Sequence, residues 1–244
     1  MIGLNFLLHS IKLVILNWKT ALRISSPLIF TIALSQLFVG SVALTGDINS
    51  TSEIPWTGFI FAMGGQIIAG LWVAVAWHRF VLLEEDSGSL IPNFSSKRVL
   101  AYLMQGLILF FILFIVGLIV GIVSGLISSA IGGFMGVILA TTITSFVILW
   151  VFYRYSPTLP AAALGETLSI DAAWKATKPY AGAILLLVLI MSLVTALLSG
   201  LLGAIALPDP IHIGILAIQT WLNIMVGISV LTTIYGVAVE NRDL

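Results

Sequence analysis

The sequence predicts an all-α polytopic membrane protein with six transmembrane helices and two further helical segments at the membrane interface. Composition, hydropathy and the placement of charge lead to this fold class. Hydrophobic residues make up 60% of the 244 residues and charged residues 8%, whereas charged residues form roughly a quarter of a soluble domain. The mean hydropathy is +1.18. Long apolar blocks alternate with short polar segments, as in a chain that crosses a bilayer several times.

The N-terminal segment, residues 1–26, is predicted to form an amphipathic helix that lies in the interface. At the helical period its polar residues fall on one side, where they would face lipid headgroups. This helix either orients the first span or recognises lipid, and the sequence leaves both readings open. The polar residues of this side are Asn5, His9, Lys12, Lys19 and Arg23.

Six apolar stretches follow, and we treat the chain as a single integral membrane domain. Residues 27–152 hold spans one to four, residues 153–180 form a polar elbow, and residues 181–244 hold spans five and six and a short tail. The predicted spans are residues 27–44, 57–83, 99–128, 134–152, 180–202 and 211–239.

Positive charge predicts the orientation of these spans. All ten Lys and Arg residues fall on the side of the N-terminus, while the opposite loops hold only the acids Asp47, Glu53 and Asp209. Cytoplasmic loops are enriched in Lys and Arg, so both termini are predicted to be cytoplasmic.

Small residues recur in spans three and four at a spacing of four. Small side chains let two helix backbones approach closely in lipid, so we expect these spans to form a tight hairpin. The alternative is a homodimer through the first of the two stripes. The stripes are Gly117, Gly121, Gly125 and Ser129 in span three, and Gly132, Gly136, Ala140 and Thr144 in span four.

Most catalytic and metal chemistries lack their residues in this chain. The chain has no cysteine, which excludes thiolate chemistry. His9, His78 and His212 are far apart and none has a second ligand at helical spacing, so no metal site is expected. No hydrolase or nucleotide-binding motif is present. The net charge is zero, so nothing in the overall balance indicates a nucleic-acid partner. We therefore predict neither an enzyme nor a bound cofactor.

Polar residues in or beside the spans give two sets of candidates. His78 and Arg79 precede the acids Glu84, Glu85 and Asp86, and they either form a polar site with them or mark the end of a span. The amides Gln66, Gln105 and Asn223 either line an intramembrane polar path or bond between helices.

The elbow contains the clearest local signals. Ser156-Pro157 is predicted to start a short helix, Gly165 to end it in the left-handed conformation, and Ser169 to cap a second helix. Between Arg154 and Thr177 the chain reads R-x-S-x-x-L-P-A-x-A-L-G-E-x-x-S-x-x-x-A-W-x-x-T. This pattern resembles uncharacterised bacterial inner-membrane families of the YciC type and the membrane domain fused to some glycerophosphodiester phosphodiesterases. The resemblance implies a bacterial inner-membrane protein of undefined activity, and the phosphodiesterase activity belongs to a separate catalytic domain that we do not expect here.

A weak internal repeat accompanies the elbow. Trp18-Lys19 and Trp174-Lys175 each end an interfacial segment ahead of a helical hairpin. Parallel repeats of this kind occur in transporters, and chance accounts equally well for so few matching residues.

These observations predict a non-enzymatic protein that organises membrane lipids or partner proteins at the cytoplasmic interface. Arg154, with Arg79, is expected to hold a phosphate or to pair with Glu166. One alternative is a transporter or flippase that uses the three amides, and another is an auxiliary subunit of a larger membrane complex. The candidate interface residues are Arg154, Glu166, Trp174, Arg79 and His78.

Overall fold

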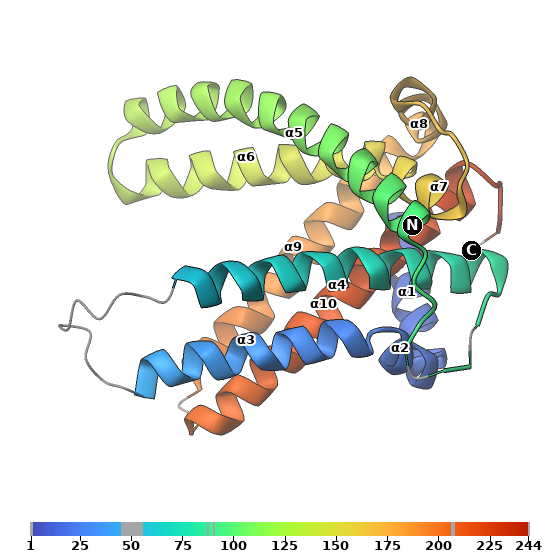
Figure 1. The fold of residues 1–244 in the computed structure, drawn as a ribbon. Coiled ribbons are helices and arrows are strands. Elements are labelled where there is room, and N and C mark those ends of the chain that lie inside the picture. Colours follow the sequence, from blue (N-terminus) through green and yellow to red (C-terminus); the bar gives the residue numbers. More distant parts are fainter. Residues whose placement is uncertain (1, 45–55, 87, 90, 206–207, 244) are drawn as a thin grey trace.

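The described part of the chain is mostly helical and contains no strand (Figure 1). The computed structural model describes all residues except 1, 45–55, 87, 90, 206–207 and 244, and the side chains of residues 36–44, 56–59, 61–62 and 209 are not described either. The long helices are α3 (Ser26–Leu44), α4 (Trp56–Leu83), α5 (Ser96–Ile131), α6 (Gly133–Tyr155), α9 (Ala181–Ala204) and α10 (Asp209–Ala238). The short ones are α1 (Ile2–Leu16), α2 (Trp18–Ile24), α7 (Thr158–Leu164), α8 (Ile170–Ala176) and the 3₁₀ turn η1 (Lys178–Tyr180). The all-α prediction is confirmed.

Five of these helices, α4, α5, α6, α9 and α10, have the length and composition needed to cross a membrane. The chain is therefore a multi-pass membrane protein by its architecture. The side chains of α3 are described only as far as Ser35. The first predicted span, residues 27–44, which would be the sixth crossing helix, therefore stays a prediction. The loop predicted between spans one and two lies outside the described residues.

Helices α3 and α4 pack as one hairpin and α5 and α6 as another, α9 and α10 follow them in the chain, and both chain ends lie at the same end of the bundle (Figure 1). The short helices α1, α2, α7 and α8 gather at that end. We call these four helices, together with the segment 84–95, the collar. A chain whose two ends lie on the same side of a membrane crosses it an even number of times, so the arrangement fits six spans. That this side is cytoplasmic remains a prediction.

Helix α1 packs on α9 and α10. Its buried residues include Phe6, Ser10 and Val14, which recur at helical spacing. Gly3 permits a close approach, because a Cβ there would lie 2.3 Å from the carbonyl oxygen of Ala183. The amide of Asn17 donates to the Leu13 carbonyl (2.9 Å) where α1 gives way to α2. The single helix predicted over residues 1–26 is thus two helices and the first residue of α3, and its apolar face covers protein.

The α5–α6 hairpin turns at Gly132, whose φ of +73° lies in the region that favours glycine. The backbones meet where a Cβ on Gly136 would lie 2.5 Å from the Ser128 carbonyl oxygen. Gly117 also faces α6, while Gly121 and Gly125 have open space beside them. A step of four residues turns a helix about 40° past a full turn, so a stripe at that spacing rotates away from its partner. The predicted hairpin is therefore confirmed, but only part of the predicted Gly117 stripe lies in it.

The elbow splits into two helices that differ in burial. Gly165 ends α7 with a φ of +88°, and the Ser169 hydroxyl accepts the Ala172 N–H (3.1 Å) at the start of α8, as predicted. Ser156 does not cap α7, because its hydroxyl donates to the Tyr153 carbonyl (2.9 Å). Helix α7 packs against α4, α5 and α10 and is largely buried. Its small residues permit that approach, so α7 belongs to the protein interior, whereas α8 is mostly open.

Candidate functional site

Arg98 lies in the first turn of α5, within the collar end of the bundle. The Ser95 carbonyl accepts the N–H groups of Arg98 (3.0 Å) and Val99 (2.9 Å), which starts the helix. The half-buried Arg98 side chain lines two cavities. Among the described residues, no acceptor forms a hydrogen bond or an ion pair with its guanidinium. It is a cation held at a cavity wall without a protein partner.

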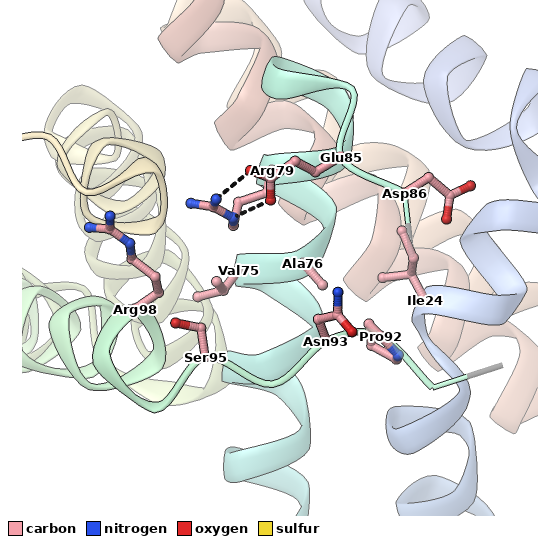
Figure 2. Close-up of a pocket in the computed structure, with 10 residues that line it drawn as sticks. All are labelled: Ile24, Val75, Ala76, Arg79, Glu85, Asp86, Pro92, Asn93, Ser95 and Arg98. Carbon is pink, nitrogen blue, oxygen red and sulfur yellow. Dashed lines mark hydrogen bonds and ion pairs between the residues drawn. The ribbon is translucent and has the colours of Figure 1, made fainter. Parts of the chain in front are cut away.

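The first cavity, of about 340 Å³, opens between α4, the segment 84–95 and the start of α5. Figure 2 shows Arg79 reaching from α4 toward the side on which Arg98 lies, with Glu85 against the Arg79 guanidinium. The polar residues of the wall are Arg79, Glu85, Asp86, Asn93, Ser95 and Arg98.

The donors of Arg79 are engaged by protein groups. Its Nε and Nη2 donate to the two carboxylate oxygens of Glu85 (2.8 and 2.5 Å), and its Nη1 donates to the Ala163 carbonyl (3.1 Å). Ala163 lies in the last turn of α7, where carbonyls lack helical partners and attract cations. Arg79 therefore ties α4 to α7, and the predicted pairing with the acids that follow it is present at Glu85.

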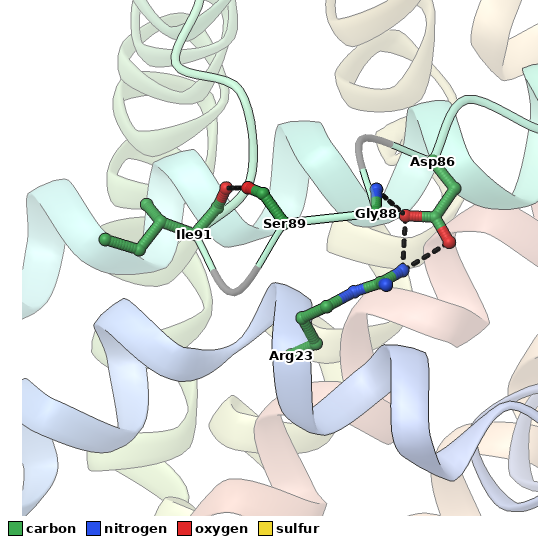
Figure 3. Close-up of polar contacts among 5 residues, drawn as sticks. All are labelled: Arg23, Asp86, Gly88, Ser89 and Ile91. Carbon is green, nitrogen blue, oxygen red and sulfur yellow. Dashed lines mark hydrogen bonds and ion pairs between the residues drawn. The ribbon is translucent and has the colours of Figure 1, made fainter.

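Asp86 is bound in a second ion pair (Figure 3). Both of its carboxylate oxygens accept from Arg23 Nη2, and Oδ1 also accepts the Gly88 N–H (2.9 Å). The Gly88 N–H, and after it the Arg23 guanidinium, hold the pKa of the Asp86 carboxyl below its usual value. With Glu85 matched to Arg79 and Asp86 matched to Arg23, the charge of Arg98 is the one left unmatched in the first cavity.

The second cavity, of about 470 Å³, lies between α5, α7 and the segment 165–169. Gly165 makes room for the guanidinium, because a Cβ there would lie 1.5 Å from Arg98 Nη1. The polar residues of the wall are Arg98, Gln105, Thr158, Glu166, Thr167 and Ser169.

Glu166 supplies the opposite charge in this second cavity. Its Oε2 accepts from the Tyr235 hydroxyl (2.6 Å), which fixes the carboxylate beside α10. No cation among the described residues forms an ion pair with it. The predicted pair with Arg154 is therefore not formed, and the second cavity holds one unmatched cation and one unmatched anion.

Arg154, predicted as a phosphate ligand, is 3% exposed and bonded within the protein. Its Nε donates to Thr177 Oγ1 (2.9 Å) and its Nη2 to the Trp174 carbonyl (2.8 Å). The guanidinium also lies 3.9 Å from the ring centroid of Trp174, a favourable cation–π arrangement. Arg154 thus joins α6 to α8. Trp18, the counterpart of Trp174 in the predicted repeat, is 54% exposed, so the two differ in environment.

His78, also a predicted interface residue, is fully buried. The Thr232 hydroxyl gives its proton to the Ile228 carbonyl (3.0 Å), so at 2.8 Å it accepts from His78 Nδ1. The other ring nitrogen, Nε2, then accepts from the Tyr102 hydroxyl (3.3 Å). This arrangement fixes one neutral tautomer and joins α4, α5 and α10.

The three amides predicted as a polar path do not share a cavity. Gln105 lines the second cavity, while Gln66 and Asn223 line neither it nor the other two described cavities. Gln66 is half-buried on α4 and Asn223 is exposed on α10. The described residues contain no group of three or more His, Asp or Glu that could hold a metal ion.

Sequence reasoning missed Arg98. Arg98 is one of the ten Lys and Arg residues that predict the orientation, and the sole local signal for it is the basic pair Lys97-Arg98 ahead of a long span. No family model, curated protein or solved structure matches the chain.

Proposed function

We propose that the protein is a non-enzymatic membrane protein of the bacterial inner membrane that organises lipid at its cytoplasmic face, through a headgroup phosphate held by Arg98 at the collar end of the bundle. This keeps the function predicted from the sequence and moves the phosphate ligand from Arg154 and Arg79 to Arg98.

One observation carries the proposal: Arg98 presents a guanidinium that has no acceptor among the described residues to two cavities at the polar end of a membrane bundle. Guanidinium groups bind phosphate oxygens through paired, charge-assisted hydrogen bonds. A half-buried cation gains more from such a partner than a fully solvated one, because water screens it less.

The surrounding residues hold this cation in place. Arg79 holds α7 against α4 through its hydrogen bond to the Ala163 carbonyl. Arg23 links α2 to the segment 84–95, which forms part of the wall of the first cavity, through its ion pair with Asp86. Arg154 fixes α8, which follows the segment 165–169 of the second cavity. In this proposal they are structural supports of the lipid site.

The test is native mass spectrometry of the full chain, purified from its membrane in mild detergent. Wild type should retain phospholipid, and Arg98→Gln should lose most of it. Lys97→Gln is the matched control, since it removes the neighbouring exposed cation, which lines neither cavity. An unchanged lipid complement in Arg98→Gln would refute the site.

Transport of a small or lipidic molecule is the second candidate function. It is favoured by Gln105, which extends the polar wall of the second cavity along α5. Uptake of labelled lipid across proteoliposomes that depends on Gln105 would support transport over static binding. An auxiliary role in a larger complex remains the third proposal, and a protein that co-purifies in stoichiometric amount would support it.

A further inference from the structure

We infer that the second cavity binds the zwitterionic headgroup of a phosphatidylethanolamine-type lipid, with the phosphate on Arg98 and the primary ammonium on Glu166. This inference rests on the proposed function and names the class of lipid. The juxtaposition that carries it is a cation and an anion in one cavity wall that are paired neither with each other nor with any other charged residue in the described chain.

The other charged residues that line these two cavities are paired: Arg79 with Glu85, and Asp86 with Arg23. Farther away, Lys175 pairs with Asp171 and Arg242 with Glu240. Arg98 and Glu166 line the same cavity and form no ion pair with each other, so both charges are available to a ligand that carries the two opposite charges.

The backbone and a hydrogen bond hold the two charges in place. The Arg98 guanidinium lies against Gly165, where any side chain would collide with it. The Glu166 carboxylate is fixed by the Tyr235 hydroxyl at Oε2. A carboxylate that accepts one neutral hydrogen bond keeps further acceptor sites and its full negative charge. A primary ammonium, with three N–H donors, fits those remaining sites.

The cavity also suits the rest of a headgroup. Thr158, Thr167 and Ser169 add hydroxyl groups to the wall, and the apolar Ala101, Ala162 and Leu168 complete it. A volume of about 470 Å³ falls within the usual range for small-ligand sites. The collar end, where polar residues meet the ends of apolar helices, is the level at which headgroups lie.

The ammonium contact predicts selectivity among common phospholipids. A choline headgroup has no N–H to donate to Glu166, and a glycerol headgroup has no cation. A charge-assisted hydrogen bond changes affinity by about tenfold or more. The full chain in nanodiscs should therefore prefer dioleoylphosphatidylethanolamine over the phosphatidylcholine and phosphatidylglycerol analogues by about tenfold.

Two variants separate the two contacts, and competitive lipid binding to nanodisc-embedded protein, read by native mass spectrometry, measures them. Glu166→Gln can still accept the Tyr235 hydrogen bond but carries no charge, so it should lose the preference for phosphatidylethanolamine and bind phosphatidylglycerol more tightly than wild type does. Arg98→Gln should bind all three lipids more weakly, and Lys97→Gln should bind them as wild type does.

Three outcomes would overturn the inference, and they differ in what they leave standing. Equal binding of the three lipids by wild type, with loss in Arg98→Gln, removes the ammonium contact and keeps the proposed function. Displacement of lipid by soluble glycerophosphoethanolamine at equal concentration makes the ligand a soluble zwitterion. Wild type that retains no phospholipid refutes both the inference and the proposed function.

Discussion

Two arginines at the same end of the molecule have opposite environments. Arg154 is 3% exposed, donates to Thr177 and Trp174, and lies over the Trp174 ring. Arg98 is half-buried, faces two cavities and has no acceptor in the part of the chain that the structure describes. The first stabilises the fold, and the second is available to a ligand. A buried, fully bonded cation is expensive to disturb, while an unpaired one contributes little to folding.

The largest expected effect is on the buried member of this pair. Arg154→Gln should lower the free energy of unfolding by about 3 kcal/mol, because it removes two charge-assisted hydrogen bonds and a cation–π contact. Arg98→Gln should change it by no more than about 0.5 kcal/mol. Unfolding in mixed micelles by detergent titration measures both. Equal destabilisation by the two variants would contradict the division into structural and ligand-binding arginines.

A smaller effect is expected where the buried group is neutral. Thr232→Val should cost about 1–3 kcal/mol, because His78 Nδ1–H then lacks its acceptor. Thr220→Val, on an exposed part of the same helix, should stay within about 0.5 kcal/mol, since that hydroxyl bonds only the Leu216 carbonyl of its own helix. The same titration compares the two. If both variants behave alike, burial does not decide the cost of losing a polar group in α10.

The smallest effect on stability is expected at the partly exposed Arg23–Asp86 ion pair. The pKa of Asp86 is lowered from its ordinary value of 3.8, so its stabilisation is present above that value and is lost as the pH falls through the lower, folded pKa. The melting temperature of wild type should exceed that of Asp86→Asn by a small, constant margin at neutral pH, and the margin should shrink and vanish as the pH falls through the lowered pKa of Asp86.

Arg23→Gln provides the internal control for this pH dependence. The Gly88 N–H is the larger cause of the lowered Asp86 pKa, so Arg23→Gln should keep part of the acid sensitivity that Asp86→Asn abolishes. A margin for Asp86→Asn that does not change between pH 7 and pH 3 would show that the pair contributes through packing alone.

The sequence predicts two of the three local backbone signals in the elbow correctly, and Ser156, which does not cap α7, is the exception. Gly165 takes the left-handed conformation and Ser169 caps α8, because both depend only on neighbouring residues. The apolar blocks also predicted the long helices, since length and hydropathy are properties of one segment. The burial of α7 was not predicted, because it depends on α4, α5 and α10 meeting around its small residues.

The candidate site was predicted less well than the fold, and for a physical reason. Whether an arginine is free depends on which acceptors other segments bring to it. Arg154 donates a hydrogen bond to Thr177, so its guanidinium is already engaged by the protein. Arg98 is separated in sequence from Gly165 and Glu166, and their approach creates the cavity. Residues of the same type therefore change roles through contacts that composition and spacing do not encode.

The packing of α1 on α9 and α10 affects the order in which the helices assemble. Helix α1 is synthesised before α9 and α10, and it buries Phe6 and Val14 where it packs on them. Until those helices are inserted, the apolar face of α1 has no protein surface to cover it. An amphipathic helix in that position rests on the lipid surface. Docking of α1 therefore follows the insertion of α9 and α10, and a nascent protein that stops before α9 displays that face to the bilayer.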